Sequence, residues 1–116
     1  MAAQIGSPAP SFSLRAHTGD VFDNEALKGK KTLVVFIPFP FTGNCDGEAC
    51  MLRDNLGQLN DLDANVVIIT VHAGPTNKEW ATKENLPFPV LSDFWPHGEV
   101  TQAFGCFNDQ RGCAMR

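Results

Sequence analysis

Two short apolar runs constrain the fold of this chain more than any other feature. "TLVVFI" (Thr32–Ile37) and "NVVIITVH" (Asn65–His72) are rich in β-branched residues. Nearly continuous apolar runs of this length are typical of parallel strands that are buried on both faces of a sheet. They are far too short to cross a bilayer. The chain is therefore expected to build its core around two central strands.

The segments that follow these runs have the spacing of helices. Beyond Ala49, apolar side chains recur every three or four residues, which marks one face of a helix. These side chains are Leu52, Leu56, Leu59 and Leu62. "NKEWATKEN" predicts a short helix before Pro87, and "GEVTQAFG" predicts one or two helical turns closed by Gly105. "PVLSD" between them predicts a third strand.

The order of elements predicts the fold class. "SFSLRAHTGDVF" alternates around a Thr18-Gly19-Asp20 turn and predicts a hairpin ahead of the first apolar run. A hairpin followed by alternating strands and helices indicates a single α/β domain, residues 1–116, with parallel strands and right-handed crossovers. Ligand sites in such sheets lie beyond the carboxyl ends of the strands. "PFPFTGNCDGEAC" (Pro38–Cys50) occupies that location, so we expect the site there.

Charge and composition exclude several classes of function. The net charge is −4 and the nine Lys and Arg are scattered, so no nucleic-acid footprint is present. The N-terminal "MAAQIGSPAPSF" lacks the charged start and apolar core of a signal peptide, and we expect a cytoplasmic protein without a membrane role. Four cysteines in such a chain suggest redox, catalytic or metal chemistry rather than a disulfide framework.

Cys45 is the best candidate for a reactive thiol. A thiol reacts as its thiolate, and the first turn of a helix offers free N–H groups and the positive end of the dipole. Asn44 is a candidate N-cap just before it. Asp46 and Glu48 would repel a thiolate, so a nearby cation is expected. The later arginines are Arg53, Arg111 and Arg116.

Thr42 and Pro38, which precede Cys45 in the chain, suit the same chemistry. The Thr42 hydroxyl lies within a turn's reach and can both accept and donate a hydrogen bond. Pro38 has no N–H to donate and can wall off one side of a site.

The spacing of Cys45 and Cys50 separates the two thiols in an intact helix. Five positions correspond to a Cα separation of about 8.5 Å, whereas disulfides need less than about 7 Å. Gly47 between them lowers the cost of unwinding by about 1 kcal/mol relative to alanine. A pair that can bond only after local unwinding suits a catalytic cycle rather than a structural staple.

The residues of this segment resemble a known family. Pro38, Thr42 and Cys45 match the peroxiredoxin signature P-x-x-x-T-x-x-C, and "GSPAPSFSL" is similar to the family's entry segment. "FPVLSD" with "FWPHGEVTQAFGCFN" resembles the alkyl hydroperoxide reductase E group of actinobacteria. The resemblance implies a thioredoxin-like fold and thiol-dependent reduction of hydrogen peroxide or organic hydroperoxides. It also implies a homodimer, a low-molecular-weight thiol or redoxin as reductant, and no metal or organic cofactor.

The same resemblance implies a role for each site residue. Cys45 would attack the peroxide and become a sulfenic acid. Thr42 would hold the thiolate and the peroxide, and Pro38 would shield the site. Arg116, in "CAMR", would supply the expected cation, and Glu48 would orient it.

Two features depart from the alkyl hydroperoxide reductase E pattern. That group usually has one cysteine, whereas "CDGEAC" resembles the Q-type peroxiredoxins, in which the second cysteine resolves the sulfenic acid. Cys50 is thus either a resolving cysteine or a small core residue on the helix. In addition, family members continue beyond the position of Arg116 with a strand hairpin and a closing helix. We therefore expect this part of the fold to be missing here.

Several alternatives remain open at this stage. Cys45, Cys50, Cys106 and Cys113 could form a zinc site, although intervals of four and six residues are poor for one. The chain could also be a truncated, non-catalytic interaction module, whereas a thioredoxin-like disulfide reductase is disfavoured because C-x-x-C is absent. Cys106 is expected in the core, and Cys113 there or as a second redox partner.

The two tryptophans have different expected roles. Trp80 is predicted to pack against the sheet from its short helix. Phe94 and Trp95, in "SDFWPHG", are expected either to pack within their loop or to form part of a dimer face.

Overall fold

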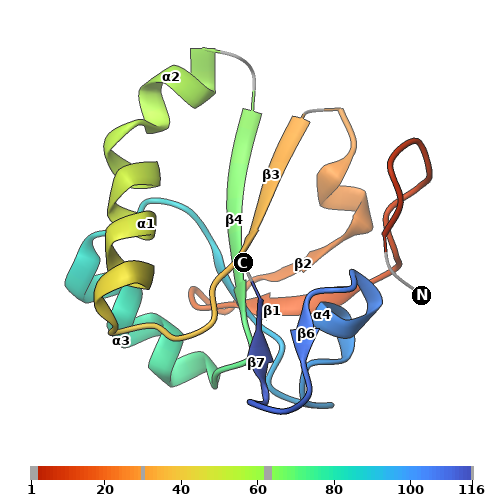
Figure 1. The fold of residues 1–116 in the computed structure, drawn as a ribbon. Helices are drawn as coiled ribbons and strands as arrows, with labels where there is room; N and C mark the ends of the chain where they lie inside the picture. Colours follow the sequence, from red (N-terminus) through yellow and green to blue (C-terminus); the bar gives the residue numbers. More distant parts are fainter. Residues whose placement is uncertain (1–2, 30, 62–63, 116) are drawn as a thin grey trace.

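The computed structural model describes residues 3–29, 31–61 and 64–115, and it confirms an α/β fold (Figure 1). The strands are β1 (Ser13–Ala16), β2 (Val21–Asp23), β3 (Lys31–Phe36), β4 (Ala64–Thr70), β5 (Val90–Ser92), β6 (Phe107–Asn108) and β7 (Cys113–Ala114). The helices are α1 (Gly43–Asp54), α2 (Leu56–Asp61), α3 (Gly74–Glu84) and α4 (Glu99–Ala103), with a 3-10 turn, η1 (Asn24–Leu27).

Five strands form the main sheet in the order β2-β1-β5-β4-β3. β3, β4 and β5 run parallel, and β1 pairs antiparallel with both β2 and β5, so the predicted hairpin is confirmed. The expectation that both apolar runs are central is wrong for β3. It is the last strand in this order, because β6 and β7, the described strands outside the main sheet, pair with each other.

The core has two parts, one on each face of the sheet. Successive side chains on a strand point to opposite faces, so Ile37 joins the cluster beneath α1 and α3, whereas Phe36 joins the cluster beneath α4. Figure 1 shows α1 and α3 on one side of the strands and α4 on the other. This double burial explains why the strands contain almost continuous apolar residues.

The helices differ from their predicted bounds. The helix predicted to follow Asn44 and to carry the leucines up to Leu62 begins at Gly43 and is interrupted at Asn55, and Leu62 lies outside the described residues. The Asn55 side chain donates to the Met51 carbonyl oxygen at 2.8 Å and so closes α1. α3 begins at Gly74, three residues earlier than expected, because a proline in the first helical turn lacks only an N–H that would have no partner there. The pair β6–β7 was not predicted.

Candidate active site

The loop after β3 leaves the sheet where its strands end, as the sequence predicted. The Ile37 N–H still donates to the Ile69 carbonyl oxygen at 3.1 Å, and Pro38 follows immediately. The Pro38 carbonyl oxygen lies 3.2 Å from Nε2 of His72, which follows β4. The His72 ring also packs against Phe39, with their centroids 6.0 Å apart. His72 therefore contacts this loop through its ring nitrogen and through its ring face.

Helix α1 starts directly behind the loop. Thr42 is the N-cap, with extended backbone angles, and its carbonyl oxygen accepts the Asp46 N–H at 2.8 Å. The prediction of Asn44 as N-cap is therefore wrong, because the helix begins at Gly43 and includes Asn44 in its first turn. The Thr42 hydroxyl donates to the Phe39 carbonyl oxygen at 2.6 Å, so its oxygen keeps the capacity to accept a further hydrogen bond.

Cys45 is the third residue of α1 and is only 2% exposed. It belongs to the same buried cluster as Ile37 and Trp80. The N–H groups of the first turn and the positive end of the helix dipole lie at this end of α1. Because the thiol is buried, only small reactants can reach it while the loop in front of α1 keeps this conformation.

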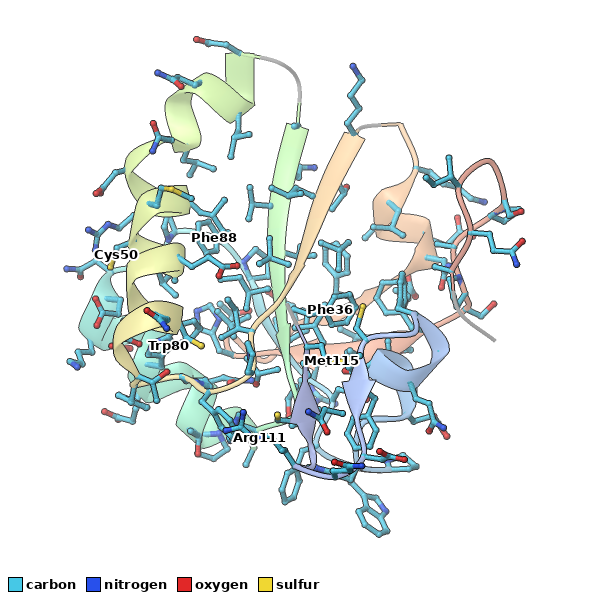
Figure 2. The ribbon with its side chains drawn as sticks, viewed as in Figure 1. Phe36, Cys50, Trp80, Phe88, Arg111 and Met115 are labelled. Carbon is cyan, nitrogen blue, oxygen red and sulfur yellow. The ribbon has the colours of Figure 1, made fainter. Side chains whose placement is uncertain are left out.

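Asp46 does not leave an uncompensated negative charge beside Cys45. Its Oδ1 accepts hydrogen bonds from Trp80 Nε1 at 2.7 Å and from the Phe41 N–H at 3.0 Å. Lys83 Nζ lies 3.9 Å from the other carboxylate oxygen. The predicted packing of Trp80 is confirmed, since its side chain is fully buried beneath α1 (Figure 2). Its bond to Asp46 was missed, because the two residues lie 34 positions apart.

The three candidate arginines occupy different places. Arg53 donates to the Glu84 carbonyl oxygen and pairs with Asp54 at 3.0 Å. Arg111 lies over the Phe39 ring, 5.1 Å from its centroid, at the end of the sheet where β3 and β4 finish (Figure 2). Arg116 lies outside the described residues. Glu48 is half-buried one turn after Cys45, and its pairing with Arg116 stays a prediction.

Cys50 lies in the same unbroken helix as Cys45, and neither thiol takes part in a disulfide. The Cys50 thiol donates to Oε2 of Glu84 at 3.1 Å. This hydrogen bond, followed by burial and the charge of Glu84, raises the pKa of Cys50. Glu84 was not singled out from the sequence, since nothing in the spacing relates the two residues.

The other two cysteines lie away from this cluster. Cys106 packs half-buried against the second core cluster, and burial raises its pKa. Cys113 is buried on β7. Among residues 3–29, 31–61 and 64–115, no three His, Cys, Asp or Glu side chains gather as metal ligands would. The proposed four-cysteine zinc site is therefore not favoured.

The exposed side chains include the two aromatics of residues 94 and 95. Phe94 is half exposed and Trp95 is 82% exposed. Packing within the loop therefore does not account for Trp95.

No helix among the described residues is long and apolar enough to span a membrane.

A buried cysteine at the head of a helix, directly beyond a parallel strand, defines a thiol-dependent oxidoreductase on a thioredoxin-like sheet. Comparison with known proteins agrees. Residues 5–116 match the AhpC/TSA family. The chain is 45% identical over 113 residues to alkyl hydroperoxide reductase E of Mycobacterium tuberculosis and of Mycobacterium bovis, covering 97% of this chain and 74% of theirs. It is 36% identical over 110 residues to a putative peroxiredoxin bcp of Coxiella burnetii, covering 95% of this chain and 72% of that one.

Solved structures of proteins from the same family have the same fold. The crystal structure of peroxidoxin BcpB from Mycobacterium tuberculosis superposes with a TM-score of 0.82 at 26% identity, covering 89% of this chain and 66% of that one. AhpC of Mycobacterium bovis gives a TM-score of 0.83 at 25% identity, covering 98% and 73%. The chain belongs to the AhpC/TSA family, the peroxiredoxins. The family's chemistry is that of an oxidoreductase that reduces peroxides with thiols, and the non-catalytic alternative is not favoured.

Proposed function

We propose that Cys45 is the residue through which this protein reduces hydrogen peroxide or organic hydroperoxides. The supporting observation is its position in the first turn of α1, directly after the Pro38–Thr42 loop. The Cys45 thiolate attacks one peroxide oxygen and breaks the O–O bond. The sulfur becomes a sulfenic acid, and the leaving oxygen takes a proton to give water or an alcohol.

Thr42 and Pro38 shape the place where the peroxide binds. The Thr42 oxygen can accept a hydrogen bond from the peroxide, and rotation of its hydroxyl away from the Phe39 carbonyl would allow donation to it. Pro38 is held by His72 and shields the thiol from one side. Glu48 and Arg116 complete the site in this proposal, with the guanidinium stabilising the negative charge on sulfur and oxygen.

Cys50 resolves the sulfenic acid once α1 has unwound. Its thiol replaces the hydroxyl group on the Cys45 sulfur, which forms a disulfide and releases water. A low-molecular-weight thiol or a redoxin then reduces the disulfide. In the alternative route, the same external thiol resolves the Cys45 sulfenic acid directly.

The exposed aromatic residues favour a homodimer. Phe94 and Trp95 present apolar surface on the loop after β5, and exposed aromatic side chains are enriched at protein interfaces. A cytoplasmic location also belongs to the proposal.

Replacement of Cys45 by serine tests the proposed role directly. We expect Cys45→Ser to abolish hydroperoxide consumption in the presence of a thiol reductant. Cys113→Ser is the matched control, because Cys113 is equally buried but lies on β7. Peroxidase activity that survives in Cys45→Ser and disappears in Cys113→Ser would reverse the assignment.

A further inference from the structure

Glu84 is hydrogen-bonded to α1 through both its side chain and its backbone. Its carboxylate accepts the Cys50 thiol hydrogen at 3.1 Å, and its backbone carbonyl oxygen accepts a hydrogen bond from the Arg53 guanidinium. Cys50 and Arg53 are three residues apart, so they lie on one side of the helix. Residues 50–53 of α1 are therefore docked on the last residue of α3, and unwinding of α1 around Cys50 separates the thiol from Glu84.

The location of this carboxylate is unfavourable for α3 itself. Glu84 is the last residue of the helix, where the dipole disfavours negative charge. Its side chain is only 16% exposed, although Lys83 Nζ lies 3.7 Å from its second oxygen. A largely buried carboxylate at a helix C-terminus does not stabilise that helix. The stability of α3 therefore does not explain the position of the Glu84 carboxylate against Cys50.

The charges around Cys50 have opposing effects. Glu84 raises its pKa by the hydrogen bond and by charge, and Asp54 acts in the same direction, whereas Arg53 lowers it. Lys83 faces Glu84 rather than the thiol. The hydrogen bond is the largest of the contributions, so the protonation of Cys50 depends on its being docked against α3.

We propose that Glu84 is a positioning residue for Cys50, and that its carboxylate holds the thiol docked on α3 until helix α1 unwinds. This proposal rests on the proposed role of Cys50 as resolving cysteine. While α1 is intact, Cys50 is held as a poor nucleophile and is protected from peroxide. Unwinding removes it from the carboxylate, and only then does it become an effective nucleophile for the Cys45 sulfenic acid.

The chemical step balances without a further reactant. Cys50 loses its proton to solvent after leaving Glu84, and its sulfur attacks the Cys45 sulfur. The S–S bond forms as the S–OH bond breaks, and the departing hydroxide takes up a proton to become water. The two thiol sulfurs supply the two electrons that reduced the peroxide oxygen.

The first test measures the protonation of Cys50 in the Cys45→Ser protein. The rate of iodoacetamide modification is followed against pH, and peptide mass spectrometry separates Cys50 from Cys106 and Cys113. Glu84→Gln should lower the pH at which the modification rate of Cys50 is half-maximal (its midpoint), since the amide retains the shape of the carboxylate but not its charge. Glu79→Gln, an exposed position on the same helix, should leave the midpoint unchanged. An unchanged midpoint in Glu84→Gln overturns the proposal.

The second test measures disulfide formation in protein that retains Cys45. After one equivalent of hydrogen peroxide, acid quenching and mass spectrometry give the rate at which the Cys45–Cys50 disulfide appears. Glu84→Gln should speed this step by about fivefold, because a charge-assisted hydrogen bond that opposes unwinding is weakened. A slower step would mean that Glu84 acts as a base for the attack, which contradicts the gating role.

The two tests separate failure of this proposal from failure of the proposed function. The titration is performed without Cys45, so its outcome concerns Glu84 alone. Absence of a Cys45–Cys50 disulfide in the unmodified protein would overturn Cys50 as resolver, and the gating role with it. A purely structural role for Glu84 predicts neither a shifted midpoint nor a faster disulfide.

Discussion

Trp80 donates a hydrogen bond to Asp46 at 2.7 Å, and so ties the middle of α3 to the first turn of α1 beside Cys45. Asp46 in turn accepts the Phe41 N–H of the loop that carries Thr42. One carboxylate therefore connects the reactive helix start, the loop in front of it and the helix packed behind it. The geometry of the proposed site depends on this connection.

Trp80→Phe should destabilise the protein by about 2–4 kcal/mol. The change removes the indole donor of a largely buried carboxylate and leaves a cavity in the first core cluster. Urea unfolding followed by circular dichroism measures the loss. Glu79→Gln, an exposed substitution on the same helix, is the control and should change stability by less than about 0.5 kcal/mol. Equal effects of the two changes would show that the Asp46 contact contributes nothing.

Alkaline pH should destabilise the reduced protein through Cys50. The folded state raises the pKa of this thiol above its ordinary value of 9.0, so the folded state holds the proton more tightly than the unfolded state. The resulting stability is fully present below pH 9 and is lost as pH rises through the folded-state pKa. Urea unfolding at a series of pH values under reducing conditions should show this loss, and Glu84→Gln should reduce it. Cys106, whose pKa burial also raises, contributes in the same direction in both proteins.

The two arginines near the C-terminal end should differ in their effect on peroxide reduction. Arg116→Ala should lower the rate of peroxide reaction by about a hundredfold if its guanidinium stabilises the reacting charge. Arg111→Ala should have a much smaller effect, because Arg111 packs on the Phe39 ring and such an exposed contact is worth about 0.5–1 kcal/mol. Stopped-flow measurement of the peroxide reaction compares them. A larger loss in Arg111→Ala would move the cationic role to that residue.

The proposed dimer should depend on Trp95. Replacement of this side chain, which is 82% exposed, by aspartate places a charge in the expected interface and should yield monomers at micromolar concentration. Sedimentation velocity measures the species present. Glu79→Gln, on an exposed part of α3, serves as the control and should leave the distribution unchanged. A monomeric unmodified protein would remove the dimer from the account.

The sequence predicted the α/β class, the hairpin and the position of Cys45, because strand periodicity and the segment after the first apolar run are local patterns. It did not predict that β3 lies at the edge of the described sheet, since strand order depends on pairing between distant segments. The start of α1 was predicted two residues too late, because asparagine is a favoured N-cap residue and Gly43 has weak helix propensity.

The contacts of the site were harder to predict than its location. The bonds from Trp80 to Asp46 and from Cys50 to Glu84 each join residues 34 positions apart. Side chains on separate helices meet only once the packing of α1 against α3 is known. The contact of His72 with the Pro38 carbonyl oxygen could not be predicted for the same reason.

Chemical trapping of the oxidised sulfur tests the central claim most directly. The Cys50→Ser protein is treated with one equivalent of hydrogen peroxide in the presence of dimedone, which reacts with sulfenic acids, and the labelled peptide is identified by mass spectrometry. Removal of Cys50 leaves the sulfenic acid available for trapping. The account predicts a dimedone adduct on Cys45. An adduct on Cys106 or Cys113 instead, with Cys45 unmodified while peroxide is consumed, would contradict it.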